Sequence, residues 1–126
     1  MKHILAITII LTTLSFSSQE KKCSDIKNGK FKYFDSSANE IIVIRKDSIQ
    51  IDSSTTSKLT YHSKIKWLND CKYDMTIFKV NNPEMKLLIG TTFEFEVLDI
   101  VVNKIKLKTK TVNKERESEH IMEIIE

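Results

Sequence analysis

The fold is decided at residues 67–73, WLNDCKY, where two alternating runs of apolar and polar residues meet at a short turn. In residues 59–67 every second residue is Leu, Tyr, Ser, Ile or Trp, while lysines, a threonine and a histidine occupy the other phase. A period of two places the two sets on opposite faces of a β-strand. We therefore interpret residues 59–67 as a strand with one buried face and residues 71–77 as its antiparallel partner.

The turn between these two strands determines which residues face each other. A three-residue loop at residues 68–70 would align Trp67 with Cys71 and Ile65 with Tyr73, which keeps both apolar sets on one face. A slip of one residue would send one of the two sets to the opposite face. We therefore expect the three-residue loop.

A second hairpin is expected around a turn at residues 46–47, within the run IIVIRKDSIQI. Pairing Ile44 with Ile49 places Ile42 opposite Ile51, so that both isoleucine pairs share one face. Agreement between register and hydrophobic pattern is typical of a well-specified hairpin. We expect this isoleucine face to point into the core.

Alternation also predicts strands at residues 30–33, 93–97 and 105–111, and residues 121–125 are interpreted as a strand rather than a helical turn. A change of phase near residues 98–99 indicates a β-bulge. The chain therefore reads as an all-β protein, an antiparallel meander of about seven to eight strands that forms a small barrel or half-barrel. A β-sandwich is the alternative architecture.

Residues 1–18 read as a signal peptide, because a positive start precedes an apolar stretch and then small residues. Cleavage is expected after Ser17 or Ser18. The apolar stretch is about half the roughly 20 residues that a membrane-spanning helix needs, so no transmembrane span is expected after cleavage. Export through the Sec pathway to the periplasm or the exterior follows. Residues 19–126 are then a single β-rich domain.

Cys23 and Cys71 are the only two cysteines of the sequence. An exported chain matures where thiols are oxidised, so we predict a Cys23–Cys71 disulfide. Closing such a long loop would destabilise the unfolded chain by about 4 kcal/mol. Two separate buried thiols are the alternative.

Four lysines alternate along one predicted strand: Lys104, Lys106, Lys108 and Lys110. They could present charge to an anionic partner such as a polyanion, a lipid headgroup or an acidic glycan. On the neighbouring strand Asp99 is expected opposite Lys108 and Glu96 opposite Lys110, so that these carboxylates would neutralise part of this stripe. A solubilising outer face is therefore the favoured interpretation.

The sequence contains no pattern that predicts catalysis, a metal or a cofactor. Cys71 and His62 could form a nucleophile and base, but His62 occupies the polar phase of its strand, away from the predicted inner face. Glu94 and Glu96 have a spacing that glycosidases use, yet they also lie on the polar phase. No zinc-ligand spacing and no nucleic-acid signature occur. We therefore expect no enzyme, no metal site, no cofactor and no nucleic-acid partner.

Aromatic residues supply most of the bulk of the predicted core. They could line a cavity for a small molecule or lipid, or they could fill the interior of a barrel this small. Filling is the favoured expectation.

Three segments carry a resemblance: residues 28–33 (NGKFKY), the hairpin with Arg45 and residues 48–50, and residues 67–73. On these the chain resembles small secreted proteins of Bacteroidota-type bacteria, a group that sometimes carries a transferred label of DNA topoisomerase IV. The chain has neither the length nor the ATP-binding motif for that activity. It is more distantly similar to lipocalin-like barrels, although Lys30 and Phe31 follow Gly29 where lipocalins have Gly-x-Trp.

Together these features predict an exported, monomeric, non-enzymatic β-domain that binds an unknown protein, glycan or lipid partner. The alternative is a carrier of a small molecule or lipid with a lipocalin-like barrel. An enzyme of unknown class is the third possibility.

Overall fold

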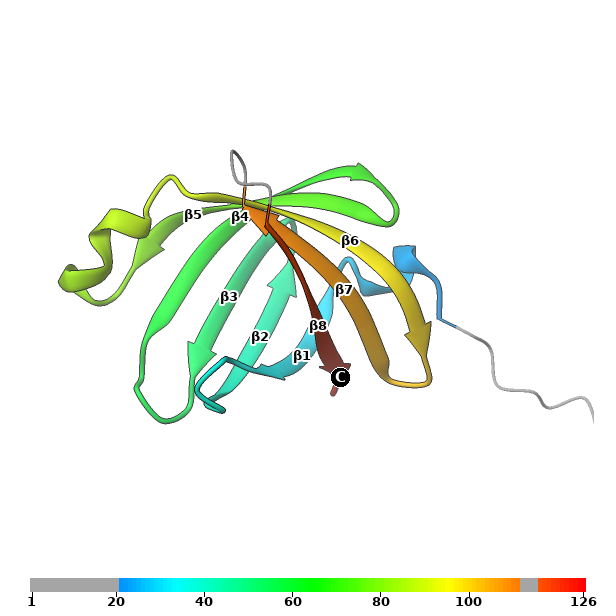
Figure 1. Ribbon diagram of the computed structural model, residues 1–126, viewed down its shortest axis with the longest axis horizontal. Helices are drawn as coiled ribbons and strands as arrows, with labels where there is room; N and C mark the ends of the chain where they lie inside the picture. Colours follow the sequence, from blue (N-terminus) through cyan, green and yellow to red (C-terminus); the bar gives the residue numbers. More distant parts are fainter. Residues whose placement is uncertain (1–20, 112–115) are drawn as a thin grey trace, which may run out of the picture.

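The computed structural model describes residues 21–111 and 116–126. They form an antiparallel meander that closes into a barrel in the order β1-β2-β3-β4-β5-β6-β7-β8 (Figure 1). The strands are β1 (Gly29–Phe34), β2 (Glu40–Lys46), β3 (Ile49–Ser54), β4 (Thr60–Asn69), β5 (Lys72–Val80), β6 (Thr92–Val101), β7 (Lys104–Thr111) and β8 (Glu117–Ile124). The predicted all-β barrel is confirmed. The predicted signal peptide, residues 1–18, lies outside the described residues.

Two short 3₁₀ helices, η2 (Cys23–Ile26) and η3 (Pro83–Leu88), lie at opposite ends of the barrel (Figure 1). The end with η2 is the floor, where Ile26 is only 1% exposed and packs into the core. The end with η3 is the mouth. No helix in the described parts of the chain combines the length and the apolar character that a membrane crossing requires.

The barrel closes where β8 meets β1, through the pairs Phe31 with Ile124 and Lys32 with Glu123. Gly29 begins β1 with a φ of 138°, a conformation that favours glycine. A Cβ at this position would lie 3.0 Å from the carbonyl oxygen of Glu126. Gly29 therefore lies at a close backbone approach that allows the barrel to close.

The β4–β5 hairpin confirms the predicted inner face but not the predicted register. Trp67 pairs with Tyr73 and Ile65 with Met75, two residues further along than expected. The predicted three-residue loop is wrong, because the ladder continues to Asn69 and shifts register after Trp67. Both aromatic rings still lie on one face, with their centroids 4.7 Å apart.

The β2–β3 hairpin differs more strongly from its prediction. Its turn consists of Asp47 and Ser48, which both have positive φ angles, 53° and 64°. This is the geometry that suits a two-residue turn between twisted strands. Ile44 consequently pairs with Ile51, not with Ile49.

The face of this hairpin is also reversed. Arg45 and Gln50 point inward with 2% and 3% exposure, whereas Ile44 is 48% exposed on the outside. The predicted inward isoleucine face is therefore wrong. Ile41 and Val43 of β2 point inward, and beyond them Arg45, Gln50 and Asp52 form a polar network on the inner side of the hairpin.

Two predictions near the C-terminal end of the chain are confirmed. The β6–β7 ladder shifts register between Val97 and Asp99, close to the predicted bulge. Residues 121–124 belong to β8, a strand and not a helical turn, and residue 125 follows its end. The barrel therefore closes with the residues that were the most ambiguous in the sequence.

Candidate functional site

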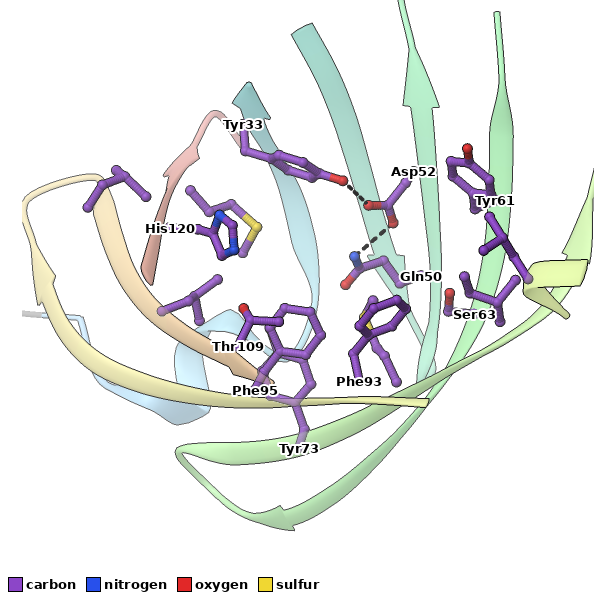
Figure 2. A pocket seen from close by; sticks show the side chains of 16 residues that line it. Tyr33, Gln50, Asp52, Tyr61, Ser63, Tyr73, Phe93, Phe95, Thr109 and His120 are labelled. Carbon is purple, nitrogen blue, oxygen red and sulfur yellow. Dashed lines mark hydrogen bonds between the residues drawn. The ribbon is translucent and has the colours of Figure 1, made fainter. Parts of the chain in front are cut away.

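The candidate site is a cavity of about 350 Å³ in the mouth half of the barrel. Its lining is mainly aromatic and aliphatic and includes Tyr73, Met75, Ile77, Phe93, Phe95, Leu107 and Met122. Figure 2 shows the rings of Tyr73, Phe93 and Phe95 together with polar side chains of the same lining. Phe31 and Tyr73 are each only 1% exposed, as expected for aromatic residues that fill the interior, but the mouth half of the barrel is left unfilled.

The floor of the barrel is built on Arg45, a buried guanidinium at the end of β2. Nε and Nη2 donate hydrogen bonds of 2.9 and 2.7 Å to Oε1 of Gln50. Nη1 donates to the carbonyl oxygen of Ile26 at 2.9 Å, and Nη2 donates to the Tyr73 hydroxyl at 3.0 Å. Arg45 therefore ties η2 to strands β2, β3 and β5.

Aromatic rings enclose the same guanidinium. The central carbon of Arg45 lies 5.2 Å from the ring centroid of Phe31, 5.6 Å from that of Trp67 and 4.8 Å from that of Tyr73. A cation near aromatic faces gains electrostatic stabilisation that grows as water is excluded. Aromatic rings and uncharged hydrogen-bond acceptors thus stabilise the buried positive charge of Arg45.

The polar network continues from Gln50 to the cavity wall. Nε2 of Gln50 donates a hydrogen bond of 2.8 Å to Oδ1 of Asp52, and the hydroxyl of Tyr33 donates one of 2.8 Å to Oδ2 (Figure 2). Alternation along β3 places Gln50 and Asp52 on the same inner face. A carboxylate is therefore presented inside the barrel by β3.

Burial controls the ionisation of this group. Asp52 is 7% exposed. Its pKa is raised by burial, although the hydrogen bonds from Gln50 and Tyr33 and the charge of Arg45 act in the opposite direction. Burial and the neighbouring Asp52 also raise the pKa of Tyr33. The site therefore favours a tyrosine that donates and a carboxyl group that holds its proton more tightly than in water.

The opposite wall of the cavity carries two further polar side chains, Thr109 from β7 and His120 from β8. Thr109 Oγ1 is buried without a hydrogen-bond partner among the described residues. Nε2 of His120 lies 3.0 Å from Oγ of Ser118, and both residues are exposed. No described carboxylate hydrogen-bonds to His120, so this pair lacks the third group that orients a catalytic base.

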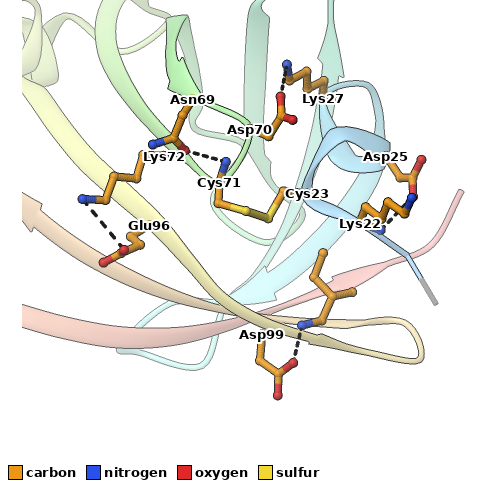
Figure 3. Close-up of a disulfide and its surroundings, with 11 residues drawn as sticks. Lys22, Cys23, Asp25, Lys27, Asn69, Asp70, Cys71, Lys72, Glu96 and Asp99 are labelled. Atoms are coloured by element: carbon orange, nitrogen blue, oxygen red, sulfur yellow. Dashed lines mark hydrogen bonds and ion pairs between the residues drawn. A yellow bond between two sulfur atoms is a disulfide. The ribbon is translucent and has the colours of Figure 1, made fainter.

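The predicted disulfide is confirmed. Cys23 and Cys71 are bonded, with their Cα atoms 5.2 Å apart (Figure 3). Beside them Lys27 forms an ion pair with Asp70, 3.0 Å from Nζ to Oδ1. The bond holds η2 against the β4–β5 turn, and because Cys71 is oxidised it is no nucleophile for His62.

The lysine stripe lies on the outer face of β7. Lys106 pairs with Glu119 at 3.2 Å, Lys108 with Glu96 at 3.4 Å, and Lys110 with Glu94 at 3.4 Å. Nζ of Lys104 forms no ion pair with a described residue. An anionic partner for the stripe stays a prediction.

The cross-strand partners of the stripe differ from the prediction by two residues. Asp99 lies opposite Lys106, and Glu96 lies opposite Lys108. Glu94 and Glu96, the spaced carboxylates of the sequence, are thus engaged with lysines on the outer face. Within the described part of the chain, no group of three His, Cys, Asp or Glu residues is placed to hold a metal ion.

The sequence did not identify Arg45, Gln50 or Asp52 as residues of the site. Gln50 and Asp52 alternate with Ile49 and Ile51, a pattern that normally indicates a polar outer face. The alternation along β3 was recognised, but its polar residues were assigned to the outer face of the sheet and not to the inner face. Arg45, which lies opposite Gln50 in the β2–β3 ladder, could have been the signal that this face is polar.

Comparison of the chain with protein-family models, with curated proteins and with solved structures found no match.

Proposed function

We propose that this protein binds a small, mainly apolar molecule inside its barrel and acts as a carrier rather than an enzyme. The observation that supports the proposal is the cavity of about 350 Å³ above a tightly packed floor. Binding pockets for small molecules have volumes of roughly 300 to 1,000 Å³, mostly apolar walls and a few placed polar groups. The interior of this barrel has all three properties.

The contrast between floor and mouth supports the proposal further. Protein interiors are normally packed as densely as organic crystals, because unfilled apolar space forfeits dispersion contacts. The floor follows this rule, with Phe31, Arg45 and Ile105 at most 2% exposed. A ligand in the mouth half would supply the contacts that the protein side chains do not make there.

We also propose that the protein works outside the cytoplasm, in the periplasm or beyond. The Cys23–Cys71 disulfide supports this location, because such bonds persist in oxidising compartments. Determination of the N-terminal residue of protein purified from its own host would test the predicted cleavage after residue 17 or 18. Retention of Met1 would contradict it.

The binding proposal is tested with an uncharged apolar fluorophore, N-phenylnaphthylamine, whose emission rises in apolar surroundings. The protein should bind it with one site per chain, and Thr109→Phe should weaken binding about tenfold by placing a ring in the cavity. Thr109 suits this substitution because its hydroxyl has no described partner to lose.

Ile44→Phe is the matched control, since it adds a ring on the outer face, where Ile44 is 48% exposed. It should leave fluorophore binding unchanged. Equal binding by both variants, or no binding by the unmodified protein, would contradict an interior site.

A second candidate is a module whose outer surface binds a protein, glycan or lipid. One observation favours it: Ile44 of β2 is 48% exposed on the outer face and pairs with Ile51 of β3 across the hairpin, although Ile41 of β2 is buried in the core. Clustered apolar side chains on a surface are typical of interaction sites. Ile44→Lys would abolish partner binding under this alternative and would leave fluorophore binding in the cavity intact.

A further inference from the structure

Asp52 is the one feature of the cavity that an apolar ligand alone does not explain. It lies in the wall at 7% exposure, and among the described residues its carboxyl group accepts hydrogen bonds only from two neutral groups, the Gln50 amide and the Tyr33 hydroxyl. No described residue forms an ion pair with it. A carboxylate buried in this way retains the capacity to accept further hydrogen bonds.

Arg45 does not neutralise Asp52 directly. Four of the five N–H groups of the guanidinium donate on the floor side, to Gln50, Tyr73 and the carbonyl of Ile26, and Arg45 does not line the cavity. Gln50 lies between the two charges, with its oxygen toward Arg45 and its nitrogen toward Asp52. The carboxyl group of Asp52 therefore lines the cavity, whereas the guanidinium of Arg45 does not.

Two tyrosines flank the carboxylate. Tyr61 of β4 is the direct cross-strand partner of Asp52, and Tyr33 of β1 reaches it across β2 (Figure 2). Aromatic rings attract cations through their negatively polarised faces, the more so where water is excluded. A negatively charged carboxylate beside two aromatic rings is an environment that suits an ammonium group.

The far wall favours a ring-bearing molecule. Strands β3 and β7 are four strands apart in a closed barrel of eight, so Asp52 and Thr109 lie on opposite sides of the cavity. Phe93 and Phe95 are apolar surfaces of the same cavity, and Thr109 Oγ1 has no described hydrogen-bond partner. A polar atom on the ring could bond to that hydroxyl.

We infer that the ligand is an organic cation, a protonated amine on a compact ring-bearing body, whose ammonium group binds Asp52 between Tyr33 and Tyr61. The inference rests on the proposed function, because it names the chemical class of the molecule in the same cavity. The positive charge of the ammonium favours the ionised form of Asp52, which burial by itself disfavours, and the ammonium then donates to the free lone pairs of the carboxylate. The ring packs against Phe93 and Phe95.

The test uses three probes that share an indole ring and differ in their end group: tryptamine, a cation; tryptophol, a neutral alcohol; and indolepropionate, an anion. Isothermal titration calorimetry with the full oxidised protein at neutral pH measures each affinity. Tryptamine should bind at least about tenfold more tightly than tryptophol, a difference of ~1.4 kcal/mol. Indolepropionate should bind more weakly than tryptophol.

Asp52→Asn should abolish this preference, so that tryptamine and tryptophol bind within about threefold of each other. The asparagine oxygen can still accept from Gln50, and its amide can donate to Tyr33, so the fold is expected to persist. Asp47→Asn is the matched control, because it removes the same charge from the exposed β2–β3 turn. It should leave the preference for tryptamine unchanged.

The outcomes separate this inference from the function on which it rests. If N-phenylnaphthylamine binds in the cavity but the unmodified protein prefers tryptophol or shows no preference, the cationic class is wrong and interior binding stands. If neither the fluorophore nor any indole probe binds, both are wrong. The comparison of probes on the unmodified protein decides the question even if Asp52→Asn does not fold.

Discussion

The side-chain oxygen of Gln50 accepts two hydrogen bonds from Arg45, 2.9 Å from Nε and 2.7 Å from Nη2. This fork joins β2 to β3 beneath the cavity and orients the Gln50 amide so that its nitrogen points to Asp52. The floor and the candidate ligand site are therefore parts of one hydrogen-bonded network.

Arg45→Met should lower the free energy of unfolding by about 3 kcal/mol or more. The substitution leaves Gln50, Tyr73 and the carbonyl of Ile26 without their donor, and each unsatisfied buried group costs about 1 to 3 kcal/mol. Urea unfolding of the oxidised protein measures the change. The control Lys46→Met, on the adjacent exposed position, should change stability by no more than about 0.5 kcal/mol; equal effects would contradict the structural role of Arg45.

The double variant Cys23→Ser with Cys71→Ser should lose about 4 kcal/mol of stability. The two cysteines are separated by 48 positions, so their bond removes considerable entropy from the unfolded chain. Denaturant unfolding with and without a reducing agent checks this. The reductant should destabilise the native protein and leave the serine variant unchanged, and a native protein insensitive to reduction would oppose the prediction.

The stability difference between Asp52→Asn and the unmodified protein should depend on pH. Because the pKa of Asp52 is raised in the folded state, chiefly by burial, the folded protein binds this proton more tightly than the unfolded chain. The protonated carboxyl of Asp52 contributes its full stabilisation at a pH below the pKa that Asp52 has in the unfolded chain. This stabilisation is lost as the pH rises through the higher pKa that Asp52 has in the folded protein.

Asp52→Asn has no such proton, so its stability relative to the native protein should increase as the pH rises from the unfolded-state pKa of Asp52 to its folded-state pKa. The other groups near Asp52 are Tyr33, Tyr61, Gln50 and Arg45, and all are retained in both proteins. Thermal unfolding between pH 4 and pH 8, at constant ionic strength, measures the difference. A difference that is constant with pH would rule out an elevated pKa.

Val102→Gly should stabilise the protein by about 1 kcal/mol. Val102 is 84% exposed in the β6–β7 turn, where its φ of 58° is unfavourable for a β-branched residue. Glycine adopts this conformation without the clash. Val101→Gly, one residue earlier at the end of β6, is the control, and it should give no gain because its φ is not positive. Thermal unfolding of both variants checks the pair.

Strands were predicted well where only one phase is apolar. In residues 59–67 the lysines exclude one face from the core, so the inner residues Ser63, Ile65 and Trp67 followed from period two alone. In β2 the residues of both alternating sets are apolar up to Ile44, so the local sequence cannot show which set points into the core. The choice depends on the partner face of β3 and on the space that the closed barrel leaves for Arg45.

The strand register of two hairpins also could not be predicted from the sequence. Asn69 and Asp70 are good turn residues, but the alignment of Trp67 with Tyr73 requires a shift in the ladder that no local pattern marks. The same holds for Asp47 and Ser48, which turn with positive φ angles although neither is glycine or asparagine. Pairing energies summed over whole strands decide such alignments.

Local alternation, turn residues and two cysteines were enough to predict an all-β meander and its disulfide, because strand faces and short turns depend on neighbours in the chain. The site was decided by tertiary structure. Arg45, Gln50 and Asp52 became interior residues only when eight strands closed into a ring and η2 covered one end. Closure removes those groups from water, and burial forces polar side chains to bond with one another.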